Sequence, residues 1–186
     1  MEDIEDIMEM AKMGMDGAIE HLRNELIKVR TGKASASMLG GIVVPYYGSP
    51  TPLQQVSNIS ASDSRTLNIQ PWEKNMLGPI EKAIFEANLG ITPQNNGEVV
   101  ILNIPPLTEE RRKELVKKSK VLAEDSKVGV RQARREAIDE IKKQVKAGYP
   151  EDAGKKREDE IQTLTNQYTD KIDEMFKAKE VDIMKI

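Results

Sequence analysis

The chain has 186 residues, with 28 Lys or Arg, 31 Asp or Glu, one His and no Cys. The missing cysteines exclude disulfides, thiolate metal ligands and a Cys nucleophile, and a single His excludes a multi-histidine metal site. No apolar run approaches the ~20 residues of a membrane span, and the acidic start at residues 1–6 does not resemble a secretory signal. We therefore expect a soluble cytoplasmic protein that binds no cofactor and is not an enzyme.

The first segment is expected to form one amphipathic helix over residues 2–30. Apolar residues recur there at steps of three and four, which is typical of one helix face. They are Ile4, Ile7, Ala11, Met15, Ala18, Leu22, Leu26 and Val29. Met8, Met10, Met13 and Met15 are expected to fill a helix interface, because thioethers adapt to irregular gaps. Gly32 is expected to supply the left-handed residue that caps this helix.

Residues 40–104 differ in composition from the segments on either side, because most of the prolines and half of the glycines fall there. Short stretches rich in β-branched residues predict strands at 42–47, 56–60, 66–70 and 99–104, and a short helix is expected over 76–88. Residues 48–50 and 95–97 are expected to be turns. Trp72 is expected to anchor the core of this small domain, with an exposed contact as the alternative.

Two further helices are expected, from Thr108 to about 147 and from about 152 to the C-terminus. Three long amphipathic helices must bury their apolar stripes against one another. We therefore predict an α+β fold, in which residues 1–30 and 105–186 form a three-helix bundle and residues 31–104 form an inserted small α+β domain. Two connections join the domains and are expected to act as a hinge; they consist of Arg30, Thr31, Gly32, Lys33, Ile104, Pro105 and Pro106.

Positive charge is concentrated in one helix. Residues 105–146 carry thirteen basic and eight acidic side chains, a net charge of +5, whereas residues 1–30 and 147–186 are net negative. At 100° per residue, eight cations fall within about 60° of one line along this helix, over roughly 43 Å. They are Lys113, Lys117, Lys120, Lys127, Arg131, Arg134, Arg135 and Lys142. Such a row suits a phosphate backbone, and the alternative is a solvated face paired with neighbouring acids.

The residues alone leave three classes of function open. The cation row favours a polyanion-binding protein. A helical adaptor or chaperone-like protein-interaction module is the alternative. An enzyme would need carboxylates of the small domain, but Asp63, Glu73, Glu81, Glu86 and Glu98 have no paired spacing, and no phosphate-binding loop motif occurs.

Several motifs resemble those of the bacterial ribosome recycling factor family, and the resemblance covers essentially the whole chain. These motifs are 28–34 (KVRTGKA), 41–48 (GIVVPYYG), 51–53 (TPL), 63–67 (DSRTL), 105–113 (PPLTEERRK) and 130–137 (VRQARREA). The resemblance implies an L-shaped monomer, with a long antiparallel three-helix bundle over residues 1–30 and 105–186 and an inserted β/α/β domain over residues 31–104. It implies that this monomer binds the ribosome after termination. It also implies that, with elongation factor G and GTP, this monomer separates the subunits and releases mRNA and deacylated tRNA, without acting on a membrane.

The resemblance also assigns site residues. It implies rRNA contacts by Arg111, Arg131 and Arg134, with Arg112 and Arg135 beside them. Together with the row of cations, the expected rRNA-binding set is Arg111, Arg112, Lys113, Lys117, Lys120, Lys127, Arg131, Arg134 and Arg135. The chain departs from the family's usual pattern at Lys33, where an Arg is frequent, and in the linker at 148–154.

Overall fold

The computed structural model describes residues 3–185, which divide into two compact units. The bundle unit consists of residues 3–30 and 109–185, and the inserted unit consists of residues 31–108. The second boundary differs from the expected one by four residues, because 105–108 group with the inserted unit. Leu107 lies against Gly32 there: a Cβ at Gly32 would be 3.0 Å from Leu107 Cγ, and the φ of +77° also suits glycine.

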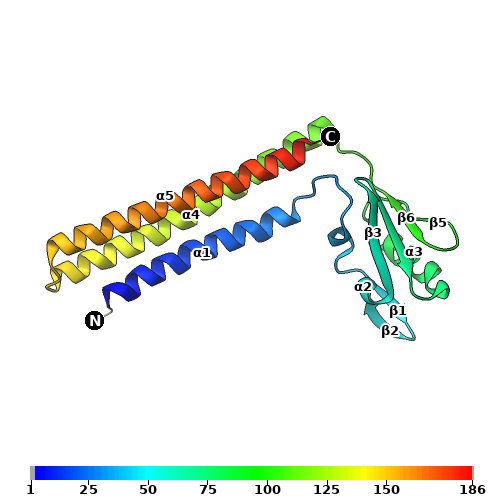
Figure 1. Ribbon diagram of the computed structural model, residues 1–186, viewed down its shortest axis with the longest axis horizontal. Helices are drawn as coiled ribbons and strands as arrows, with labels where there is room; N and C mark the ends of the chain where they lie inside the picture. Colours follow the sequence, from blue (N-terminus) through cyan, green and yellow to red (C-terminus); the bar gives the residue numbers. More distant parts are fainter. Residues whose placement is uncertain (1–2, 186) are drawn as a thin grey trace. The chain divides into compact units, whose positions relative to one another are not determined.

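The bundle unit contains three long helices, α1 (Ile4–Lys28), α4 (Glu109–Lys146) and α5 (Glu151–Met184). Figure 1 shows them side by side, with α4 antiparallel to the other two. Their shared core is aliphatic, as the composition predicts. Its fully buried side chains include Met15, Leu22, Ile141, Ile161 and Ile172. The predicted α+β fold with a helical bundle is confirmed, and the expected helix ends at residues 2 and 186 lie outside the described residues.

Small residues bring α1 and α4 into close contact. A Cβ at Gly14 would lie 3.2 Å from Ala133 Cβ, and the Ser126 hydroxyl donates a 3.0 Å hydrogen bond to the Ala18 carbonyl. Buried Ser119 donates to the Leu115 carbonyl one turn earlier. The apolar pattern therefore missed part of the buried face, because a serine that satisfies its hydroxyl within a helix can be buried like alanine.

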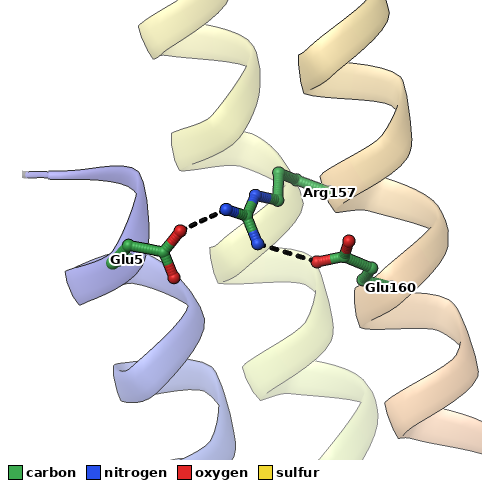
Figure 2. A network of polar contacts seen from close by, with 3 residues as sticks. All are labelled: Glu5, Arg157 and Glu160. Carbon is green, nitrogen blue, oxygen red and sulfur yellow. Dashed lines mark hydrogen bonds and ion pairs between the residues drawn. The ribbon is translucent and has the colours of Figure 1, made fainter.

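Two polar contacts tie α5 to α1. Arg157 donates to Glu5 of α1 and, at 2.9 Å, to Glu160 one turn along α5 (Figure 2). Further along the bundle, Tyr168 donates from α5 to the Asp16 carboxylate. Burial, reinforced by this hydrogen bond, raises the pKa of Tyr168 to about 12, so the hydroxyl stays protonated and continues to donate at neutral pH.

Two glycines in the bundle predict opposite responses to the same substitution. A Cβ at Gly154 would lie 2.5 Å from Val145 Cγ2, and the branched Val145 side chain has little rotamer freedom in a helix. Gly154→Ala is therefore expected to destabilise the bundle by about 1–2 kcal/mol. A Cβ at Gly17 would meet no atom within 4 Å, so Gly17→Ala should stabilise the bundle by up to ~1 kcal/mol through helix propensity.

Chemical denaturation followed by circular dichroism would measure both changes. Adding Val145→Ala to Gly154→Ala removes the overlapping methyl group and should recover most of the loss. If the two glycine substitutions shift the unfolding midpoint in the same direction, the steric explanation at Gly154 is wrong.

Two expectations for α1 were wrong. The helix ends at Lys28 with an extended Val29 as its C-cap, so Gly32 is left-handed but does not cap the helix. Met10 and Met13 do not fill an interface: they are 62% and 66% exposed, because they lie roughly 120° and roughly 180° around α1 from the middle of its buried stripe. Ile19, by contrast, is buried although the pattern did not include it.

The inserted unit contains a four-stranded antiparallel sheet with the order β3-β4-β6-β5. Its strands are β3 (Ser57–Asp63), β4 (Thr66–Pro71), β5 (Gln94–Asn95) and β6 (Val100–Asn103). A β1 (Val43–Tyr46) and β2 (Ser49–Pro52) hairpin, the one-turn α2 (Leu53–Val56) and α3 (Leu77–Glu86) complete it, together with two short 3₁₀ turns at Ala36–Leu39 and Lys74–Met76. One aliphatic core joins these elements, with Val44, Leu53, Ile69, Ile80 and Val100 fully buried.

Two expectations for the inserted unit were also wrong. Residues 49–50 belong to strand β2, and the turn is at Tyr47-Gly48, where both φ angles are positive as in a two-residue hairpin turn. Trp72 is 69% exposed and does not anchor the core. On β4 the inward residues are Leu67, Ile69 and Pro71, so the alternation of a strand points residue 72 outward.

Candidate nucleic-acid interface

The cation row lies on α4, whose regular helical rise spaces its members along one side. The buried residues of α4 include Ser119, Val130 and Ile141, and the row occupies the neighbouring quadrant of the helix. The side chains of Lys117, Lys120, Arg131, Arg135 and Lys142 are exposed. Within residues 3–185, none of these five makes an ion pair or side-chain hydrogen bond. Such unpaired cations can bind phosphates without first breaking an internal contact.

Two members of the row are engaged with α5. The Lys127 ammonium is 2.6 Å from Asp173 and 3.6 Å from Glu124, and its side chain is only 14% exposed. The hydrogen bond to Asp173 is the main reason that the pKa of Lys127 is raised. Arg134 is half-buried, and its Nη1 donates a 2.9 Å hydrogen bond to Gln162. Both side chains therefore contribute to the α4–α5 contact.

The cations at the start of α4 are arranged differently. Lys113 pairs with Glu109 at 3.1 Å, and Arg111 pairs with Glu114 at 2.8 Å. Arg112 is half-buried and donates weakly, at 3.4 Å, to the Met184 carbonyl of α5. Around a regular helix, Arg111 lies roughly 180° from Lys120, so the resemblance-based set does not share one side of α4. A single flat ligand would not reach Arg111 and Lys120 together.

Sequence reasoning missed the side chains that surround the row. Asp173 and Gln162 of α5 decide which cations are free, and neither belongs to a pattern that indicates this. Val121 and Val128 are exposed apolar residues on α4 beside the free cations. Apolar spacing could have found these valines, because they lie seven residues apart and outside the predicted core stripe.

The expected hinge residues lie in two irregular segments, 29–35 and 104–108. Each segment is hydrogen-bonded to the turn between β3 and β4: Ala34 N–H donates to Ser64 O at 2.8 Å, and Ile104 N–H donates to Arg65 O at 2.7 Å. The turn itself is braced by Asp63, which accepts from Arg65 N–H and from the Thr66 hydroxyl. These hydrogen bonds, the Arg65 one first, hold the pKa of Asp63 below its usual range.

Across positions 3–185, no three His, Asp or Glu side chains are grouped so that they could hold a metal ion. No helix in that part of the chain is long and apolar enough to cross a membrane. The row on α4 is therefore the candidate site.

Comparison with known proteins assigns the chain to a family. The model of the family described as "Ribosome recycling factor" matches residues 22–184. The chain belongs to the ribosome recycling factor family. The ribosome-recycling factors of Flavobacterium johnsoniae and Christiangramia forsetii are each 54% identical to it, over 185 and 186 residues, and the matches cover all of this chain and 99% and 100% of those proteins.

Solved structures of the ribosome recycling factor family agree with this assignment over the full length. A solution structure of a ribosome recycling factor matches with a TM-score of 0.77 at 39% identity, covering 100% of both chains. A second match has a TM-score of 0.64 at 39% identity and covers 99% of this chain and all of the other. That work describes models of the T. thermophilus ribosome recycling factor and E. coli elongation factor G bound to the E. coli post-termination complex.

Proposed function

We propose that this chain is a non-catalytic translation factor that recycles ribosomes after termination. It binds the post-termination ribosome, and with elongation factor G and GTP it separates the subunits and releases mRNA and deacylated tRNA. Family membership supports this proposal, and so does the relative placed with elongation factor G on a post-termination complex. Such a factor acts in the cytoplasm, where ribosomes are, and binds no cofactor of its own.

The free cations of α4 carry the docking part of the proposal. From Lys117 to Arg135 they extend over roughly 27 Å of one rigid helix. Because no acid among residues 3–185 pairs with them, each can displace counterions from an rRNA phosphate, which makes the binding strongly dependent on salt. Lys117, Lys120, Arg131 and Arg135 are therefore the proposed central contacts, with Arg111, Arg112, Lys113, Lys127 and Arg134 as the remaining proposed members.

Light scattering of post-termination ribosomes tests the proposed activity. Mixing them with this chain, elongation factor G and GTP should reduce the scattering as the subunits separate, and omission of any component should abolish the change. No reduction, with an elongation factor G that is active in a parallel assay, would contradict the recycling function. The helical adaptor would then be the hypothesis to pursue, and its partner binding should resist ribonuclease.

We further propose that residues 30–33 and 104–106 act as a hinge through which elongation factor G moves one unit. Pro105 and Pro106 lack backbone donors and stiffen one of the two connections. Replacing both with Gly should leave large-subunit affinity within about twofold and slow subunit separation several-fold, because a flexible connection transmits force poorly. Sedimentation binding and stopped-flow scattering measure the two effects. Unchanged splitting kinetics would contradict the role of the prolines.

A further inference from the structure

A groove on the bundle unit lies outside the proposed rRNA face. It runs between α1 and α4, has a volume of about 210 Å³, and is lined by Ile7, Met10, Ala11 and Gly14 from α1 and by Glu136 and Glu140 from α4, among others. The helices are closest at Gly14 and Ala133, where small side chains leave the surface hollow. Figure 1 shows α1 and α4 running alongside each other over this part of the bundle.

The apolar part of the groove is open to solvent. Met10 lines it and is 62% exposed, and Met13, one turn along α1, is similarly exposed. Methionine is unbranched, with several rotatable bonds and a polarizable thioether, so Met10 can adapt its shape to an inserted side chain. The floor can therefore hold an apolar side chain from a partner.

The charged part of the groove is acidic. Both ionisable residues in its lining, Glu136 and Glu140, are carboxylates. Gln132 donates to Glu136 at 3.0 Å and Lys143 pairs with Glu140 at 2.8 Å, which leaves acceptor capacity on both carboxylates. Asp6, one turn before Met10 on α1, adds exposed negative charge beside the groove. A phosphate backbone would be repelled here, whereas a cationic polypeptide would be attracted.

The groove and the free cations lie on different sides of α4. Glu136 is roughly 140° around the helix from Arg131, so a ligand held by the cations does not cover the groove. When α4 rests on rRNA, the groove remains accessible to a protein.

We propose that this groove docks a Lys/Arg-rich segment of a protein component of the post-termination ribosome. The segment sets its cations against Glu136 and Glu140 and places one apolar side chain beside Met10. This inference rests on the proposed function, because it takes the partner from the complex in which the chain would act.

Site-specific photocrosslinking tests it with the full chain. A p-benzoylphenylalanine replaces Met10 in one sample and Val128, which is exposed beside the free cations, in another. Each sample is irradiated on post-termination ribosomes. We expect the probe at 10 to attach to a protein, and the attached peptide to be rich in Lys or Arg. We expect the probe at 128 to attach to rRNA.

Charge reversal supplies the second measurement. Glu136→Arg with Glu140→Arg should lower the protein crosslink at position 10 by about threefold or more, because attraction becomes repulsion. Glu151→Arg with Glu174→Arg makes the same charge change elsewhere on the bundle and should leave the crosslink unchanged. Circular dichroism confirms that each variant is folded.

The outcomes distinguish the groove proposal from the proposed docking of the α4 cations on rRNA. A probe at 10 that attaches only to rRNA, to a second copy of this chain, or to no protein overturns the groove proposal, and so does a crosslink insensitive to the reversal. A probe at 128 that yields no rRNA adduct counts against rRNA docking, whatever position 10 shows. A charge-sensitive protein adduct at 10 without an rRNA adduct at 128 would retain the groove and reject the docking face.

Discussion

Replacing both Arg131 and Arg135 with Ala is expected to lower the affinity for the large ribosomal subunit by about 100-fold or more, since each charge-assisted contact contributes about 1.5–3 kcal/mol and the two together at least about 3 kcal/mol. Neither side chain pairs with another residue among positions 3–185, so the bundle should keep its stability. The plot of log affinity against log salt should become less steep by about one unit for each lost phosphate contact. Sedimentation with isolated subunits at several salt concentrations measures both quantities.

Two controls separate a specific contact from a change in net charge. Arg23→Ala with Lys155→Ala removes two exposed cations of α1 and α5, which pair locally with Glu20 and Glu151, and should change the affinity by less than about threefold. Lys127→Ala removes a cation that Asp173 already holds, and should affect binding much less than Arg131→Ala. If Lys127→Ala weakens binding as strongly, exposure and pairing do not identify the contacts.

Ile172→Ala is expected to destabilise the bundle by about 2–5 kcal/mol, because the substitution leaves a cavity in close-packed surroundings. Ile172 is fully buried, in the cluster that contains Met15, Leu22 and Val130. The far-ultraviolet circular dichroism signal comes mainly from α1, α4 and α5, so urea unfolding followed at 222 nm reports on this unit.

The matched control is Ile27→Ala. Ile27 lies on α1 of the same unit and is 67% exposed, so its truncation removes equal volume without forming a cavity. Its effect should stay within about 0.5 kcal/mol of zero. Similar losses for both variants would mean that side-chain burial in the bundle is not what stabilises it.

Much of the bundle was predictable because helical amphipathicity is a local property. Apolar residues at steps of three and four in α1 placed Ile7, Met15 and Leu22 in the core, where they are found. The end of α4 followed from Gly148 and Pro150, which interrupt a helix through their own backbone preferences. The β2 strand was missed because Pro50 and Pro52 indicate a turn, although a two-stranded hairpin tolerates proline at its edge.

The candidate site was also predictable in one respect and not in another. The cations of α4 share one side because residues three, four and seven apart along a helix must do so, and the sequence alone was sufficient for this. Which of them are free could not be predicted. That depends on Asp173 and Gln162, about 46 and 28 residues further along the chain, and on the rotation of α5 against α4.

Periodicity and charge segregation thus specified the helices, the inserted β unit and the cationic side of α4, since each depends on neighbours within a few turns. Contacts between helices pair Lys127 with Asp173, leave Arg131 and Arg135 without a partner among residues 3–185, and form the acidic groove beside Met10. Such contacts follow from how closely small residues such as Gly14 and Ala133 let two helices approach, which is a property of packed surfaces.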